Sequence, residues 1–181
     1  MERTDNWWRG KNSATNYIFE EIGQHTVYYL VDLSSVRSVD QLFGNNAYLI
    51  SVAFTPLFGS SNVNTMEKMF QYCTNLVSVD FSSIDISKVT NTYYMFLHDK
   101  KLAYVNMENL DFSSLKKATS MFSYCHSLTS INIDLKNARS LETMEAMFFE
   151  CKSLKSMDLS NVQSLKLNNI NSMFRECLSL S

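Results

Sequence analysis

Proline and glycine are scarce in this chain of 181 residues, which contains one proline and four glycines. A chain with so few of them has no Pro/Gly-rich linker that would divide it into flexibly joined domains. The sequence also has no run of the roughly 18 to 20 apolar residues that a membrane-spanning helix needs, and no apolar signal-peptide segment follows residues 1–6. We therefore expect one body of a single architecture, and secretion is not supported by the sequence itself.

A strong surplus of charge of one sign is also missing. The 16 Lys and Arg residues nearly balance the 18 Asp and Glu residues, which leaves a formal net charge of -2. A nucleic-acid-binding surface needs a surplus of basic side chains to neutralise phosphates, so we do not expect a nucleic-acid partner. Hydrophobic residues make up 45% of the chain, a proportion typical of a globular protein with a packed core.

Catalytic motifs are absent too. The sequence has no Gly-x-Ser-x-Gly, no glycine-rich phosphate loop and no His-Glu-x-x-His. Of the three histidines, His25, His98 and His126, only His98 has an acidic neighbour, Asp99, and we interpret that pair as a solvated turn. The sequence therefore predicts a protein that is not an enzyme and that carries no cofactor.

A Met-Phe pair returns in this sequence every 26 residues. The five pairs are Met69-Phe70, Met95-Phe96, Met121-Phe122, Met147-Phe148 and Met173-Phe174. A period of 26 lies within the range of about 20 to 29 residues of leucine-rich repeats, in which each repeat buries its apolar face only against its neighbours. The period therefore predicts a leucine-rich-repeat solenoid.

Two apolar patterns fill each repeat, whose positions we count from its Met as one. Leucine occupies position eight, and apolar residues occupy positions eleven and thirteen, as in Leu76, Val79 and Phe81. This alternation predicts a short strand with one buried face. Upstream of each Met, apolar residues recur with a spacing of three, as in Val63 and Met66, which we interpret as a helix of two or three turns. The predicted fold is α/β, a leucine-rich-repeat solenoid with one short strand and one short helix per 26-residue repeat.

The repeat pattern weakens toward the N-terminus. Residues 1–26 have no repeat register, and we expect an N-terminal cap there, in which Trp7 and Trp8 pack rather than bind a ligand. Residues 27–181 form the predicted solenoid. The sequence stops at Ser181, where a further strand should begin, so we expect the solenoid to be truncated at its C-terminus.

Cysteine occupies position five of four repeats, as Cys73, Cys125, Cys151 and Cys177, and Asp99 replaces it in another. Because residues at one position line up along a solenoid, these side chains should form a ladder and not the tetrahedral cluster that zinc requires. We therefore interpret the cysteines as small buried side chains of the core, without a metal or redox role.

The strand also defines a candidate contact surface. Positions ten, twelve and fourteen alternate with the buried positions and should point outward on the concave face of the solenoid. In four consecutive repeats these positions hold Ser78, Asp80 and Ser82; Tyr104, Asn106 and Glu108; Ser130, Asn132 and Asp134; and Ser156, Asp158 and Ser160. Every row carries a carboxylate and none carries Lys or Arg, which predicts a polar, acidic stripe with Tyr104 near its middle.

This stripe has two interpretations, and the sequence leaves both open. It could bind a basic peptide, a carbohydrate that stacks on Tyr104, or a cation between carboxylates. Alternatively, repeated Ser, Asn and Asp only keep an exposed strand face soluble and resistant to edge association. The convex side carries aromatic residues that we interpret as packing between repeats rather than as partner contacts: Tyr72, Tyr93, Tyr94, Tyr124 and Phe149.

Two stretches of the chain carry a family resemblance. Residues 121–133 (MFSYCHSLTSINI) and 147–161 (MFFECKSLKSMDLSN) resemble the Met-Phe-x-x-Cys-x-Ser-Leu repeats of BspA-like bacterial surface proteins. The resemblance covers residues from about 42 to the end. Three features depart from the family pattern: Asp99 in place of Cys, Lys136 in place of an apolar residue, and no signal or wall anchor.

The resemblance implies a leucine-rich-repeat solenoid that is displayed on the cell surface or secreted and takes part in adhesion. The leading hypothesis is a non-enzymatic surface adhesion and binding module that presents its polar, acidic concave face to a protein or glycan partner. The alternative is an intracellular structural scaffold or assembly subunit, and the missing signal peptide is compatible with such a cytoplasmic location.

Overall fold

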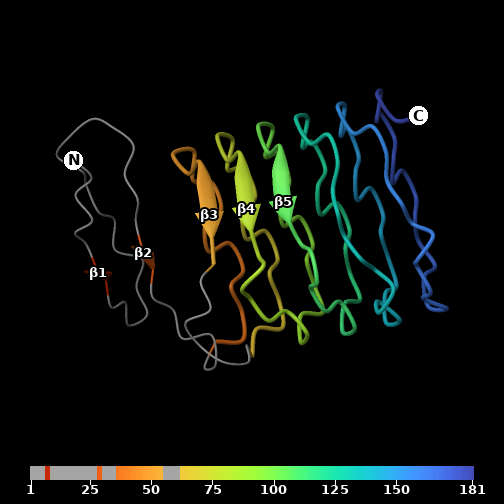
Figure 1. The fold of residues 1–181 in the computed structure, drawn as a ribbon, viewed down its shortest axis with the longest axis horizontal. Coiled ribbons are helices and arrows are strands. Elements are labelled where there is room, and N and C mark those ends of the chain that lie inside the picture. Colours follow the sequence, from red (N-terminus) through yellow and green to blue (C-terminus); the bar gives the residue numbers. More distant parts are fainter. Residues whose placement is uncertain (1–6, 9–27, 30–35, 55–61) are drawn as a thin grey trace. The chain divides into compact units, whose positions relative to one another are not determined.

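The computed structural model describes residues 7–8, 28–29, 36–54 and 62–181 (Figure 1). The chain divides into two compact units, Met1–Asp32 and Leu33–Ser181. In the first unit, the short strands β1 (Trp7–Trp8) and β2 (Tyr28–Tyr29) pair in parallel. The remainder of the predicted cap at residues 1–26 lies outside the described residues, so the boundary between cap and solenoid stays a prediction.

The second unit is built from coils that lie side by side along one axis (Figure 1). One side of the coils carries a three-stranded parallel sheet of β3 (Ser51–Ala53), β4 (Ser78–Asp80) and β5 (Tyr104–Asn106). Ser51 lies opposite Ser78, which in turn lies opposite Tyr104. One repeat therefore separates each strand from the next, with 26 residues between β4 and β5, as the period predicts, and 27 between β3 and β4. We call this the strand side.

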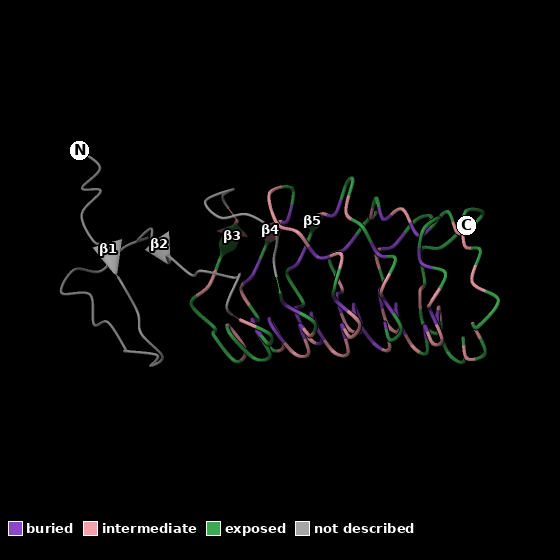
Figure 2. Cartoon of the chain, turned by 90° about the horizontal axis from the view of Figure 1, so that it is seen from below, coloured by how far each residue is buried: buried purple, intermediate pink, exposed green. Residues whose placement is uncertain are grey.

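A second ladder of backbone pairs connects the coils on their other side. It consists of single parallel bridges that join Ser38, Thr65, Asn91, Lys117, Thr143 and Asn169 in that order. The segments that follow these residues, represented by residues 66–73 in one coil, form what we call the turn side. The side chains buried between the two sides form one continuous core (Figure 2).

The predicted helix is wrong for the described residues, because the turn side consists of hydrogen-bonded turns and the described segments contain no helix. Backbone N–H groups of alternate residues, such as Lys68 and Phe70, donate to carbonyls of the next coil, Tyr93 and Met95, over 2.9 and 2.8 Å. Between them, the N–H of Met69 donates three residues back within its own coil. A helix would use all of these donors internally, so the ladder between coils excludes it.

These turns also explain the apolar spacing that suggested a helix. Many bonds of the turn side span three residues, such as those from Met69 to Met66 and from Cys73 to Phe70, and the residues that each bond joins are buried. Inward-facing side chains therefore recur there with a spacing of three. The turns require left-handed backbone at Lys68 (φ 57°) and Tyr72 (φ 61°), and the same two repeat positions have positive φ in the later coils. An α-helix has no such residues.

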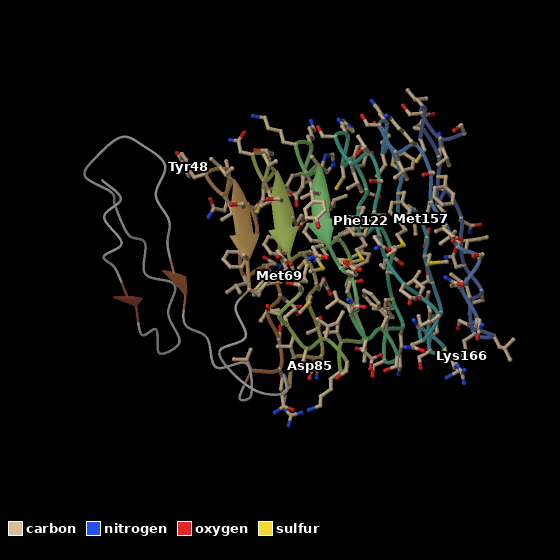
Figure 3. The ribbon with its side chains drawn as sticks, viewed as in Figure 1. Tyr48, Met69, Asp85, Phe122, Met157 and Lys166 are labelled. Atoms are coloured by element: carbon tan, nitrogen blue, oxygen red, sulfur yellow. The ribbon has the colours of Figure 1, made fainter. Side chains whose placement is uncertain are left out.

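The core is organised around a column of phenylalanines. Rings from successive coils stack with centroids 5.2 to 5.7 Å apart, and the members are Phe43, Phe70, Phe96, Phe122, Phe148 and Phe174. Phe81 of the strand side meets both Phe70 and Phe96 edge-on at 6.2 Å, so it joins the two sides of the coil. Each aromatic pair adds about 0.5–1.5 kcal/mol beyond its area burial. Figure 3 labels Phe122, a member of this column, and Tyr48, whose side chain is 94% exposed.

The cysteine ladder is confirmed as a structural feature of the core. All four cysteines are free thiols, and each Sγ donates to the carbonyl of the column phenylalanine in the preceding coil over 3.0 to 3.2 Å. Burial raises the pKa of the Cys73 thiol to about 12 and also raises that of Cys125 and Cys151. The thiols are therefore protonated donors that bind one coil to the next.

Candidate binding surfaces

The twelve predicted contact residues all lie outside the core on the strand side. Val79 and Phe81 are buried, whereas Ser78 and Asp80 beside them are partly exposed and Ser82 is exposed. The same alternation holds in the next coil, where Val105 and Met107 are buried. Their outward orientation is therefore as predicted. Whether they bind a partner remains a prediction.

Three of the four stripe carboxylates have a structural use that the sequence analysis missed. Oδ1 of Asp80 accepts the N–H of the residue two positions on, Ser82, over 2.9 Å, and Asp134 and Asp158 form the same turn at 3.0 and 2.8 Å. Asn106 does the same with its amide oxygen at 3.2 Å. These turns end the strand segment, since Asp and Asn side chains readily bond to backbone two residues on.

The turns also set the ionisation of these carboxylates. Hydrogen bonds from Ser82 lower the pKa of Asp80, and those from Lys136 and Ser160 lower the pKa of Asp134 and Asp158. Asp134 additionally pairs with the Lys136 ammonium at 2.6 Å. The stripe is thus ionised but partly engaged within the chain, which weakens the interpretation that its carboxylates exist to bind a cation.

Tyr104 is the most prominent group of the strand side. Its side chain is 58% exposed, and its neighbour across the sheet is the small Ser78. Exposed Glu108 lies in the same row, and exposed Ser130 occupies the equivalent position of the next coil. A large ring with a polar hydroxyl, surrounded by small polar residues, offers both apolar area and hydrogen bonding to a partner.

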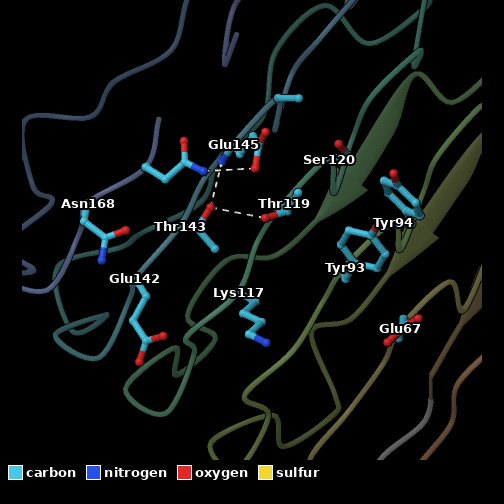
Figure 4. A pocket seen from close by; sticks show the side chains of 12 residues that line it. Glu67, Tyr93, Tyr94, Lys117, Thr119, Ser120, Glu142, Thr143, Glu145 and Asn168 are labelled. Carbon is cyan, nitrogen blue, oxygen red and sulfur yellow. Dashed lines mark hydrogen bonds between the residues drawn. The ribbon is translucent and has the colours of Figure 1, made fainter. Parts of the chain in front are cut away.

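A depression of about 670 Å³ lies on the turn side, away from the predicted stripe (Figure 4). Its lining comes from five successive coils and comprises Glu67; Tyr93 and Tyr94; Lys117, Thr119 and Ser120; Glu142, Thr143, Glu145 and Ala146; and Asn168 and Asn169. Apart from Tyr93 and Tyr94, none of these residues was singled out from the sequence. A comparison of side-chain size at the two positions before each Met would have indicated it.

Several polar groups around the depression are held by bonds between coils. The Asn169 amide donates to Glu145 over 2.9 Å, and the hydroxyls of Thr119 and Thr143 lie 3.2 Å apart. On the opposite side, Tyr93 and Tyr94 stack with centroids 3.7 Å apart. A hydrogen bond with Tyr94 raises the pKa of Tyr93 to about 12. The walls of the depression are therefore fixed before any ligand arrives.

The interpretation of the His98-Asp99 pair as a solvated turn is wrong for Asp99. The Asp99 side chain is fully buried, at 0% exposure, and neither carboxyl oxygen has a hydrogen-bond partner. Burial raises its pKa to about 9, so the group is a neutral acid at pH 7. The His98 ring stacks between Tyr72 and Tyr124, at 4.9 and 4.1 Å, which agrees with packing between repeats. The two residues therefore do not act together as an acid and base.

Metal ligands do not converge in the described part of the chain. Residues 36–54 and 62–181 contain no group of three or more His, Cys, Asp or Glu side chains that could hold a metal ion. The same residues form no helix that could cross a membrane.

The sequence matches a known family over most of its length. The family described as "Mycoplasma protein of unknown function, DUF285" matches residues 13–134 and, in a second match, residues 99–181. The chain belongs to this family. No curated protein matches it.

A solved structure supports the repeat architecture. The crystal structure of the T. pallidum leucine-rich-repeat protein TpLRR is similar to this one with a TM-score of 0.52 and 25% sequence identity. The similarity covers 74% of this chain and 57% of TpLRR, so the chain spans little more than half of that protein. The chain is therefore a repeat protein of the leucine-rich-repeat type, and this relationship suggests a binding module.

Proposed function

We propose that the chain is a non-enzymatic binding module of the BspA-like type that works in adhesion at a cell surface. It presents its strand side to a protein or glycan partner. The observation that carries the proposal is the exposed Tyr104 within a row of outward polar side chains on a hydrogen-bonded ladder. The resemblance of residues 121–133 and 147–161 to BspA-like repeats supports the surface location.

The ladder favours binding because it removes much of the entropic cost of association. The backbone of β3, β4 and β5 is fixed by pairing between coils, and the turns at Asp80, Asp134 and Asp158 fix the chain on the strand side of three coils. A partner would therefore order few groups when it binds. Exposed tyrosine is a side chain that often dominates such interfaces. Contact energy is then expected to centre on Tyr104.

Catalysis is not part of the proposed function. His98 is stacked between two tyrosines, and His126 lies 3.6 Å from Glu150. Asp99 is sealed in the core. A hydroxyl or thiol nucleophile needs a base within hydrogen-bond reach, and the cysteine thiols donate to carbonyls instead.

The strand side can be tested without damage to its turns. Asp80→Asn, Asp134→Asn and Asp158→Asn, combined with Glu108→Gln, remove the stripe's charge but keep an oxygen at each turn, as native Asn106 does. Binding would be measured on an array of extracellular-matrix proteins and printed oligosaccharides. A matched control is Asp111→Asn, because Asp111 forms the same turn with Ser113 at 2.8 Å, outside the strand side.

Tyr104→Ala should weaken binding of the retained probe by about tenfold or more, which corresponds to about 1.4 kcal/mol. The combined neutral variant shows whether charge contributes. If Tyr104→Ala and the neutral variant both bind as the wild type does, the strand side is not the contact surface.

The location is tested separately by protease shaving of intact cells that produce the protein. Release of its peptides from unbroken cells is the expected result. Protection of every peptide until the cells are lysed would favour the intracellular scaffold instead.

A further inference from the structure

Two repeat positions create the depression on the turn side. The residues directly before each Met are Glu67 and Lys68 in one coil, Tyr93 and Tyr94 in the next, then Thr119 and Ser120, then Glu145 and Ala146, and finally Asn171 and Ser172. The backbone there repeats its conformation, with φ of 57°, 58°, 51°, 51° and 56° at the second position. The side chains and not the backbone therefore change along the row, and the small Thr119, Ser120 and Ala146 leave a hollow beside the tyrosine pair.

The hollow offers both hydrogen-bond donors and acceptors. Glu142 and Asn168 border it on one side and Tyr93 and Tyr94 on the other, while Lys117 lies between them (Figure 4). Among the described residues, no side-chain partner occurs for the Lys117 ammonium or the Glu142 carboxylate. The volume of the depression, about 670 Å³, is within the range of small-ligand sites, about 300–1,000 Å³.

The charges of the lining argue against a strongly charged ligand. Three carboxylates, those of Glu67, Glu142 and Glu145, would repel an anion. The tyrosine surface that would suit a cation is already used by the chain's own Lys68, whose ammonium lies 5.8 Å from the Tyr93 ring centroid and 2.7 Å from Glu67. Lys117 would repel a second cation.

A sugar fits these constraints. Each hydroxyl is both a donor and an acceptor, so a polyhydroxy ligand can use carboxylate, ammonium, amide and threonine groups together. The C–H face of a sugar ring can lie against an aromatic side chain such as Tyr94. We propose that this depression is a binding site for a neutral oligosaccharide, separate from the strand side.

The test fills the hollow with a side chain that the repeat already accepts. Ser120→Tyr places at Ser120 the residue found at the equivalent Tyr94, where φ is similar. The control Ser113→Tyr adds the same side chain at an exposed position that belongs to neither the depression nor the strand side. A third variant, Tyr94→Ala, removes the wall and keeps the hollow open. The intact chain would be applied to an array of neutral, sialylated and sulfated oligosaccharides that also carries oligolysine peptides, and each retained probe would be titrated by calorimetry.

We expect a neutral oligosaccharide to be retained, with about tenfold or greater loss of affinity in Ser120→Tyr and in Tyr94→Ala and no loss in Ser113→Tyr. Circular dichroism shows whether each variant folds, and Tyr94→Ala decides the outcome if Ser120→Tyr does not. The site is refuted if no neutral oligosaccharide binds, or if it binds a folded Ser120→Tyr as tightly as the wild type. Retention of oligolysine alone refutes the ligand class. Variants of the strand side should not change the affinity of the depression for the oligosaccharide. The two proposals can therefore be refuted separately.

Discussion

Replacement of Asp99 by cysteine should stabilise the protein and change how its stability depends on pH. In the other coils, a thiol at this position donates to the phenylalanine carbonyl of the preceding coil, as Cys125 does to Phe96 at 3.2 Å. Asp99 makes no such bond, although its side chain is fully buried. The backbone N–H of Cys73 lies near the Asp99 carboxyl and acts to lower its pKa. Because this N–H already donates to the Phe70 carbonyl over 3.0 Å, it offsets only part of the rise in pKa that burial causes.

The magnitude follows from proton linkage. In the unfolded chain Asp99 ionises near pH 3.9, whereas in the folded chain its pKa is about 9. Between these values folding takes up a proton, so the free energy of unfolding falls by about 1.4 kcal/mol for each pH unit of increase. The stability is fully present below about pH 3.9 and is lost as the pH rises toward 9. From pH 5 to pH 8 the wild type should lose about 4 kcal/mol through this group.

Urea denaturation of the wild type, Asp99→Cys and Asp99→Asn at several pH values between 5 and 8 would measure this effect. The comparison uses the difference between each variant and the wild type, because titration of His98, His126 and exposed groups then largely cancels. As the pH rises, the free energy of unfolding of both variants should increase relative to that of the wild type. A difference that stays constant across this range would show that Asp99 is not a neutral acid in the folded chain.

Three further predictions concern the core and the turns. Phe122→Ala and Leu128→Ala should each lower the free energy of unfolding, measured by urea denaturation, by about 2–5 kcal/mol because both side chains are fully buried. Ser130→Ala should lower it little because Ser130 is exposed. Equal effects at Leu128 and Ser130 would contradict the orientation of the strand side. Asp80→Ala should lower the free energy of unfolding by about 0.5–1.5 kcal/mol in the same assay because the hydrogen bond to the Ser82 N–H is lost. Asp80→Asn keeps an acceptor and should lower it less. Equal effects of the two variants would show that the charge of Asp80 matters and its turn does not. Half-buried Cys177 should react first with a thiol reagent, and the three fully buried cysteines only on unfolding, as followed by mass spectrometry; simultaneous modification of all four in the folded protein would contradict the ladder.

The sequence predicted the inside and outside of each coil because both depend on a simple period. Leu76 and Val79 are buried and Ser78 is partly exposed, as alternation on a strand requires. The helix could not be separated from a row of turns by the same argument, since both bring residues three apart onto one face. A strict spacing of three favours turns, because a helix mixes spacings of three and four. The donors of Lys68 and Phe70 decided the matter, and they depend on a neighbouring coil.

Local sequence was a poor guide at Asp99. A histidine followed by an aspartate suggested a polar surface turn, yet position five of every other Met-Phe repeat is a cysteine that donates a hydrogen bond into the stack. The register alone would have placed Asp99 inside. In a repeat protein, position within the repeat is therefore a stronger predictor of burial than the polarity of a residue and its neighbours.

Position in the repeat also indicates where to look for function, namely at residues that depart from the repeat pattern. The ladder of backbone bonds and the phenylalanine column are nearly the same in every coil, so they explain folding and cannot distinguish one surface region from another. Tyr104, where the equivalent residues are serines, and Ser120, where the preceding coil has Tyr94, each change the surface without disturbing that backbone. Each therefore gives one side of the stack a local shape, and exchange of residues between equivalent positions can test each side while the rest of the stack is preserved.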